Sequence, residues 1–262
     1  MPRHLACLFA ALLTLVGAAG ATAADIRVMI SAGFFGVYSE LGPAFETSTG
    51  HKLITTRGPS IGDSPEAIPT RLGRGEEADV VIMDGVGVDL LDQRELTRPD
   101  SRVPLAESFI GMVVRAGQPK PDISTMDAMR KTLLAARSIA YSDSSSGTYL
   151  STIGFKKLGV ADQLAGRTRK VRGPPSGEPV AAVVARGEAD IGFQQVPELI
   201  HVPGIDFVGT VPSEVQPPTL FVGALPKNSQ HPDVGIDLLK FLSSADAAAV
   251  ITKAGLKPLS SR

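Results

Sequence analysis

Short apolar runs alternate with amphipathic segments along most of this chain. Residues 26–30 (IRVMI) and 79–84 (DVVIMD) are almost wholly apolar, which is typical of strands buried on both faces. Between them, large apolar residues recur every fourth position over 37–45, which predicts an amphipathic helix. Pro43 lies inside that helix and predicts that it is kinked or split in two.

The same two patterns predict the remaining elements. Further strands are expected at 52–56, 109–115, 138–141, 169–172, 191–194, 207–209 and 219–225. Further helices are expected at 65–72, 88–96, 126–136, 149–158, 180–186, 233–242 and 245–254. Because apolar strands alternate with helices, we expect an α/β protein whose parallel or mixed sheets are flanked by helices on both faces.

The first 24 residues have the pattern of a secretory leader rather than of a folded segment. A short positive stretch precedes an apolar run at 5–16, and small residues follow that end in an A-x-A cleavage pattern at 21–23. The stretch 5–24 is about 20 residues long, enough for a membrane anchor, but its second half is mainly Ala and Gly, which favours cleavage. We therefore expect a signal peptide at 1–24 and a mature protein in the periplasm.

Composition narrows the possible classes of function. The chain has 262 residues, of which 43% are hydrophobic and 20% charged, and a formal net charge of −1, which indicates a globular protein without a nucleic-acid partner. It has no Trp and three Tyr, so a base-stacking surface is not expected. The single cysteine, Cys7, lies in the leader, and no His or Asp cluster has metal-ligand spacing. We therefore expect no disulfide, no thiolate nucleophile and no bound metal in the mature protein.

Four of the predicted strand-to-helix loops are rich in Ser and Gly, at 31–34, 57–64, 141–149 and 173–177. In open α/β sheets such loops meet at the carboxyl ends of the strands, where helix N-termini present free N–H groups to anions. Helix capping is the alternative role for these residues. The candidate ligand-binding residues in the loops are Ser31, Gly33, Phe34, Arg57, Ser60, Ser145, Ser146, Gly147 and Thr148.

Two of these loop residues suggest different functions. A lone loop arginine is usually solvated, but Arg57 follows a predicted strand and precedes Gly-Pro-Ser, and its planar guanidinium suits a carboxylate better than a tetrahedral ion. Ser60 lies in a G-x-S-x-G pattern at 58–62, as the nucleophile of some hydrolases does. A hydrolase also needs an acid and a later histidine, for which only His201 and His231 are present, so it is the least favoured alternative.

The order of these segments resembles the periplasmic molybdate-binding family of solute-binding proteins. The resemblance spans essentially the whole mature chain and includes LGRGEEADVVIM, IAYSDSSSGTYLSTIGFKKLG and VAAVVARGEADIGFQQVPEL. It implies the type II periplasmic binding fold, in which two lobes hold a ligand between them. Lobe one would be residues 25–108 with 220–262 and lobe two residues 109–219, and the runs at 109–115 and 219–225 would carry the chain between the lobes.

The chain departs from the molybdate-binding pattern at its anion site. Gly33 stands where that family has a serine, Gln195 stands where it has a tyrosine, and the second loop is lengthened to RGPSIGDS, which adds Arg57. These departures, with the segments SAGF, TTRGPS and GFQQV, resemble a branch of the family, the bacterial aconitate isomerases. That resemblance implies a tricarboxylate ligand that Gln195 helps to bind, no cofactor, and the interconversion of cis- and trans-aconitate in the cleft between the lobes.

Isomerisation of aconitate needs a base that removes a proton from one carbon atom and returns it to another. The sequence leaves this base open. Asp143 and Tyr149 come first, followed by Tyr141 and Asp63, although Asp143 also suits a loop cap and Tyr149 also suits packing. The alternative function is a non-catalytic receptor that delivers a tricarboxylate or a molybdate-like oxyanion to the permease of an ABC-type transporter. Sequence alone does not separate the two functions, because one added base turns a receptor into an isomerase.

Overall fold

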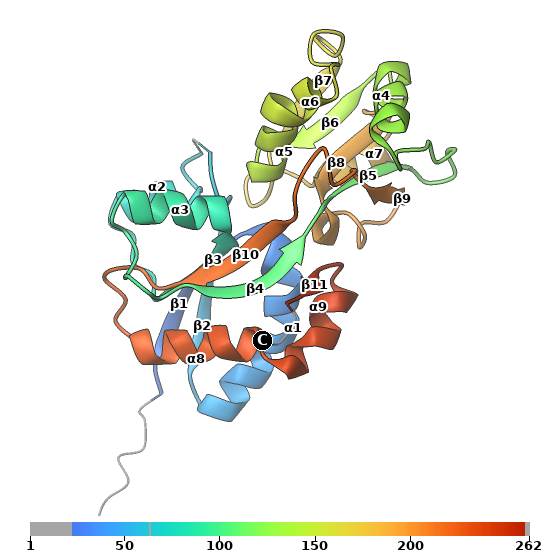
Figure 1. The fold of residues 1–262 in the computed structure, drawn as a ribbon. Coiled ribbons are helices and arrows are strands. Elements are labelled where there is room, and N and C mark those ends of the chain that lie inside the picture. The colour runs from blue at the N-terminus through green and yellow to red at the C-terminus, as the bar shows by residue number, and fades with distance from the viewer. Residues whose placement is uncertain (1–22, 63, 260–262) are drawn as a thin grey trace, which may run out of the picture.

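The computed structural model describes residues 23–62 and 64–259. The leader expected at 1–24, with Cys7, therefore lies almost wholly outside the described residues, and so does the candidate base Asp63. The described chain forms two β-sheets, each flanked by helices, which confirms the predicted α/β fold class (Figure 1). None of its described helices is both long enough and apolar enough to cross a membrane.

The first sheet has six strands and is mixed. Its strands are Asp25–Ile30 (β1), Lys52–Arg57 (β2), Val80–Asp84 (β3), Val103–Ser108 (β4), Thr219–Ala224 (β10) and Lys257–Pro258 (β11). They lie in the order β11-β4-β10-β3-β1-β2. β1 is parallel to both of its neighbours, whereas β10 is antiparallel to β3 and β4, and β11 is antiparallel to β4.

The second sheet has five strands and is also mixed. Its strands are Ile110–Arg115 (β5), Ile139–Ser142 (β6), Thr168–Val171 (β7), Ile191–Gln195 (β8) and Ile205–Thr210 (β9). They lie in the order β7-β6-β8-β5-β9. β6 is parallel to β7 and β8, whereas β5 is antiparallel to β8 and β9.

Helices cover both faces of each sheet because the central strands, such as β3, β5 and β8, are buried on both faces. They span Ala32–Thr49 (α1), Ile68–Gly73 (α2), Gly85–Gln93 (α3), Met126–Ala135 (α4), Ser145–Tyr149 (α5), Phe155–Lys157 (α6), Val180–Ala185 (α7), Pro232–Leu242 (α8) and Ala248–Lys253 (α9). Consecutive residues of one strand point to opposite sides. Ile30 packs with α1 and α8, whereas Met29 packs with α2 and α3. In the second sheet, Met112 packs with α4 and Val113 with α7.

The chain crosses between the sheets at two places. β4 ends at Ser108 in the first sheet and β5 begins at Ile110 in the second, so that Figure 1 shows them as one nearly continuous ribbon. The chain returns after β9 through residues 211–218 and enters β10 in the first sheet. At the first crossing, the backbone N–H of Val196 donates to the carbonyl of Phe109 at 3.0 Å, which ties the crossing strand to the end of β8.

Several elements differ from their predicted form, among them β11, whose two residues are too few to show a pattern. Pro43 does not split α1, because the proline is exposed and the missing hydrogen bond would have reached the carbonyl of Ser39, which is exposed as well. β4 is absent from the predicted strands, because Pro104 and two charged or polar positions break its apolar run; a bulge in the pairing of β10 accommodates the proline. The helix expected at 149–158 contains a π-helical turn, Leu150–Gly154, and begins earlier, at Ser145.

Candidate functional site

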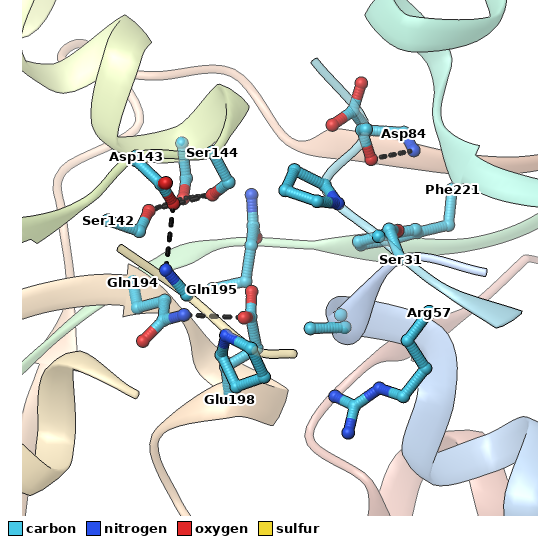
Figure 2. Close-up of a pocket in the computed structure, with 18 residues that line it drawn as sticks. Ser31, Arg57, Asp84, Ser142, Asp143, Ser144, Gln194, Gln195, Glu198 and Phe221 are labelled. Atoms are coloured by element: carbon cyan, nitrogen blue, oxygen red, sulfur yellow. Dashed lines mark hydrogen bonds between the residues drawn. The ribbon is translucent and has the colours of Figure 1, made fainter. Parts of the chain in front are cut away.

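A pocket lies between the two sheets, at the carboxyl ends of strands from both. Loops that follow β1, β2, β3, β6, β7 and β8 line it, which is where open α/β sheets bind ligands. Figure 2 shows the two sides facing each other, with Ser31, Arg57, Asp84 and Phe221 on one side. The lining residues are Ser31, Ala32, Gly33, Arg57, Gly58, Pro59, Ser60, Asp84, Ser142, Asp143, Ser144, Ser146, Gly173, Pro174, Gln194, Gln195, Glu198 and Phe221.

Two helices begin at the pocket without a side-chain cap. α1 begins after Ser31 and α5 begins after Ser144, and neither serine hydroxyl accepts a hydrogen bond from a backbone N–H of its own helix. The first-turn N–H groups of a helix have no partner within the helix and carry partial positive charge. One such end comes from each side of the pocket, so the pocket is suited to a ligand with negative charge at both of its ends.

The neighbouring helices are capped internally instead. The carboxylate of Asp84 accepts a hydrogen bond from the N–H of Gly87 at 2.8 Å and caps α3. The side-chain oxygen of Gln194 accepts from the N–H of Val180 at 3.0 Å, at the start of α7. These two helix ends are therefore satisfied by the protein, whereas those of α1 and α5 remain available to a ligand.

Two side-chain donors on the first-sheet side are buried without a partner. Within the described residues, neither the hydroxyl of Ser31 nor Nε of Arg57 has a hydrogen-bond partner. The guanidinium of Arg57 lies 4.1 Å from the centre of the Phe35 ring, which holds its plane in place. Burial lowers the pKa of Arg57, and the negative charge of Glu198 opposes that shift. Buried polar atoms are rarely left unpaired, so this pair of donors indicates a place for a ligand oxygen.

Three serine hydroxyls form a cluster on the opposite side of the pocket. The hydroxyl of Ser142 lies 2.8 Å from that of Ser144 and 3.1 Å from that of Ser146. The loop that carries them turns so tightly that a side chain at Gly147 would put a Cβ atom 1.8 Å from the carbonyl oxygen of Ser142. Glycine at this position therefore lets α5 begin directly against the end of β6.

Gly33 is also required by its surroundings. A Cβ atom at this position would lie 2.3 Å from Cζ of Phe221, whose ring packs across the start of α1. The molybdate-binding pattern has a serine here, which would collide with the ring. The pocket thus has an aromatic surface where that pattern supplies a hydroxyl, and a flat ligand fits such a surface better than a tetrahedral one.

Three carboxylates line the pocket, and two of them are engaged in holding the protein together. Both oxygens of Asp84 accept hydrogen bonds, one from Gly87 N–H and one from the Ser145 hydroxyl. Burial raises the pKa of Asp84. Asp143 accepts a hydrogen bond at 3.1 Å from the N–H of Gly173, which joins the loops that follow β6 and β7.

Glu198 is the third carboxylate and has a different environment. It lies on a 3-10 turn, Val196–Glu198, directly after β8, and its Oε2 accepts a hydrogen bond from Nε2 of Gln194 at 2.6 Å (Figure 2). Burial raises the pKa of Glu198 to about 7. The Gln194 hydrogen bond and the charge of Arg57 act against this rise, and the charges of Asp143 and Asp84 add to it.

Gln195 ties the pocket to the crossing strands. Its Oε1 accepts a hydrogen bond from the Ser108 hydroxyl at 2.6 Å, and its Nε2 donates to the Thr219 hydroxyl at 3.0 Å. Ser108 ends the outgoing strand β4 and Thr219 begins the returning strand β10. The side chain of Gln195 therefore joins both crossings to the floor of the pocket.

Besides the contacts of Gln195, two further side-chain contacts join the two sides of the pocket. The hydroxyl of Ser145 donates to the carboxylate of Asp84, and Nη2 of Arg172 lies 2.8 Å from Oε2 of Glu66. Ser145 and Arg172 belong to segments of the second sheet, whereas Asp84 and Glu66 belong to those of the first. The two sides are thus in contact around the pocket rather than splayed apart.

The structure brings seven of the candidate residues from the sequence into the pocket lining. They are Ser31, Gly33, Arg57, Ser60, Asp143, Ser146 and Gln195. Phe34 is fully buried in the core, Ser145 bonds Asp84, and Gly147 and Thr148 lie in α5 outside the lining.

The tyrosines proposed as bases lie outside the lining as well. The Tyr149 hydroxyl donates to the carbonyl of Val215 at 3.2 Å and accepts from Lys157 at 3.1 Å. Tyr141 packs against Phe155 with an edge-to-face geometry.

Four lining residues lie outside the loops selected from the sequence and were not candidates from the resemblance either: Asp84, Gln194, Glu198 and Phe221. Asp84 ends β3, Gln194 lies at the end of β8, and Glu198 follows β8 within three residues. Both strands were predicted from the sequence. The signal that these three residues carry is a polar side chain at the carboxyl end of a buried strand, which differs from the Ser- and Gly-rich composition of the candidate loops. Phe221 gave no such signal, because an aromatic residue in an apolar strand is typical of a core position.

The described residues do not assemble the machinery of a serine hydrolase. The Ser60 hydroxyl accepts a hydrogen bond at 3.2 Å from the N–H of Asp84, and no histidine is among the described residues that line the pocket. Across residues 23–62 and 64–259, no group of three His, Cys, Asp or Glu side chains is placed to hold a metal ion.

Comparison with solved structures agrees with this architecture. The periplasmic molybdate-binding protein of Azotobacter vinelandii superposes with a TM-score of 0.69 at 22% identity, over 88% of this chain and 98% of that chain. The sulfate-binding protein SubI of Mycobacterium tuberculosis superposes with a TM-score of 0.71 at 19% identity, over 90% of this chain and 88% of that chain. These similarities confirm the two-lobed fold of periplasmic binding proteins.

Sequence comparison confirms the expected resemblance. A protein of a Pseudomonas species described as aconitate isomerase is 50% identical over 234 residues, which cover 89% of this chain and 88% of that protein. The family model for bacterial extracellular solute-binding proteins matches residues 26–257, nearly all of the described chain. The chain therefore belongs to the bacterial extracellular solute-binding protein family.

Proposed function

We propose that this protein is an aconitate isomerase, which interconverts cis- and trans-aconitate in the pocket between its two sheets without a cofactor. The observation that carries the proposal is the 50% identity to the Pseudomonas aconitate isomerase over 89% of the chain. The aligned stretch covers nearly the whole of both chains, so it includes the segments that form the pocket.

The chemistry of the pocket supports a tricarboxylate ligand. Arg57 supplies a planar guanidinium, which suits a carboxylate because two N–H groups can meet two oxygens. The uncapped starts of α1 and α5 supply backbone donors from opposite sides, and the buried hydroxyl of Ser31 lacks a partner. We infer that one carboxylate of aconitate lies at Arg57 and that the others lie at the two helix ends.

The reaction needs donors in these positions. Loss of a methylene proton from aconitate gives an allylic anion whose charge spreads onto the carboxylates. Fixed N–H groups and a cation that face those carboxylates stabilise this charge as it develops, so they lower the barrier to deprotonation. Donors that bind the ground state thus also favour the transition state.

We further propose a periplasmic location after removal of the leader at 1–24, which fits the extracellular family to which the chain belongs. Lobe one then consists of residues 25–108 with 220–262, and lobe two of residues 109–219. The division of the strands between two sheets supports these limits.

Turnover by the purified mature protein tests the function. We expect trans-aconitate to be converted to cis-aconitate, followed by chromatography, and aconitate to raise the melting temperature more than citrate or molybdate does. Stabilisation by aconitate without conversion would reject the isomerase and leave a receptor that serves a permease. Stabilisation by molybdate alone would reject the carboxylate ligand.

A further inference from the structure

We infer that Glu198 is the group that carries the proton between the two carbon atoms of aconitate. This inference rests on the proposed isomerase function and adds the acid–base residue to it. Its basis is the position of Glu198 in the pocket, the side-chain hydrogen bond that holds its carboxylate, and the engagement of both oxygens of Asp84 elsewhere.

The carboxylate of Glu198 is fixed at one oxygen and open at the other. Oε2 accepts from Gln194, whose own oxygen is held by the N–H of Val180, so the amide can present only its donor to Glu198. Within the described residues, Oε1 of Glu198 has no hydrogen-bond partner. This oxygen is therefore positioned and free to exchange a proton with a ligand in the pocket.

Asp84 lacks this combination, whereas Asp143 shares it in part, since only its Oδ1 has a partner among the described residues. Asp84 has both oxygens engaged, since it caps α3 and holds Ser145 from the opposite side. Protonation of Asp84 would therefore weaken a helix start and a contact across the pocket. Asp143 holds the N–H of Gly173 and joins two loops. It stays the candidate base from the sequence and is the natural comparison for Glu198.

The charges around Glu198 suit a group that both takes and returns a proton. Burial raises the pKa of this carboxyl to about 7, so at neutral pH its acidic and basic forms are both populated. The charged groups that face it are Arg57 from the first-sheet side and the carboxylates of Asp143 and Asp84. A general base is most effective when its pKa lies near the working pH.

The proposed step balances without a co-reactant. The ionised carboxylate takes a proton from the methylene carbon, so a C–H bond breaks, an O–H bond forms, and the electron pair enters the allylic system. The same O–H bond then breaks as the proton is delivered to the other end of that system. The double bond has moved by one position, and the carboxylate is regenerated.

Replacement of the carboxyl by an amide separates proton transfer from binding. Glu198→Gln keeps the size of the side chain and an acceptor for Gln194, so we expect aconitate still to raise the melting temperature. Turnover should fall by roughly 100-fold or more, which is typical for loss of a general base. Exchange of the methylene protons of aconitate for deuterium in D₂O, followed by NMR, should fall with it.

Two further variants serve as comparisons. Glu214→Gln removes the same charge from an exposed position outside the pocket and should leave turnover unchanged. Asp143→Asn should retain measurable turnover and deuterium exchange. Full activity of Glu198→Gln, with an inactive Asp143→Asn, would overturn the inference while leaving the isomerase function intact. Absence of turnover in the native protein would instead overturn the proposed function.

Discussion

The two sides of the pocket differ in how their polar groups are satisfied. On the first-sheet side, Ser31 and Arg57 have buried donors without partners among the described residues. On the second-sheet side, Gln194 and Gln195 are held in hydrogen bonds at both ends of their amides. The first-sheet side thus has donors free to bind a charged ligand, whereas the second-sheet side holds Glu198 in a network of satisfied hydrogen bonds.

This difference assigns two tasks to two halves of the molecule. Free donors contribute most when a ligand arrives to satisfy them, so the first-sheet side should govern affinity. A satisfied network fixes the position and the pKa of the group at its centre, so the second-sheet side should govern chemistry. The following changes test that division, from the largest expected effect to the smallest.

Removal of the guanidinium should affect binding most. Arg57→Ala removes the cation that faces the ligand and leaves a carboxylate of the bound ligand unpaired. This loss should weaken the binding free energy of aconitate by on the order of 3–5 kcal/mol. We expect the Kd for aconitate to rise by roughly 100-fold or more. Isothermal titration calorimetry measures this, and Arg57→Lys is the matched control, which should recover part of the affinity. Unchanged affinity in Arg57→Ala would remove this residue from the ligand site.

The hydrogen bond from Gln194 should set the pH dependence of the reaction. In the native protein kcat/KM should rise with pH through about 7, because Glu198 must be ionised to act as a base. Gln194→Glu keeps the acceptor for the Val180 N–H but replaces the donor to Glu198 with a second carboxyl.

Two carboxylates in contact raise one another's pKa, so in Gln194→Glu the rising limb of the profile should move to higher pH by roughly one to three units. A pH profile of kcat/KM for both proteins measures the shift. A profile that stayed in place would show that Gln194 does not position the titrating group.

Burial of Glu198 should also reduce the stability of the protein at alkaline pH. Its pKa is about 7 in the folded protein and 4.5 as the ordinary value, so between these values the folded state holds a proton that the unfolded state has released. The free energy of unfolding therefore falls as the pH rises through this window.

Glu198→Gln lacks this ionisation. It should be more stable than the native protein by on the order of 3 kcal/mol above about pH 8, with the difference vanishing below about pH 4.5. Chemical denaturation at several pH values measures it. A variant that is destabilised equally at every pH would indicate lost packing rather than relief of a buried charge.

The sequence selected loop residues on both sides of the pocket and missed polar residues at the ends of buried strands. Ser31 and Arg57 lie in loops whose composition departs from that of ordinary helix caps, so local pattern was enough to select them. Gln194 and Glu198 are fixed by contacts with residues brought together only by the fold, including the start of α7. Most strands were predictable because their apolar runs are a local pattern. β4 has only a weak pattern of this kind and forms through its pairing with β10, which includes a bulge.

The smallest expected effect comes from Asp143, whose charge interacts with Glu198 electrostatically without a hydrogen bond between them. Asp143→Asn keeps a side-chain oxygen for the N–H of Gly173 but removes a negative charge that raises the pKa of Glu198. The rising limb of the kcat/KM profile should therefore move to lower pH, by less than about one unit, since charges separated by a polar pocket interact weakly. The rising limb is therefore expected to move to lower pH in Asp143→Asn and to higher pH in Gln194→Glu. A shift of both variants in the same direction would mean that the titrating group in the profile is not Glu198.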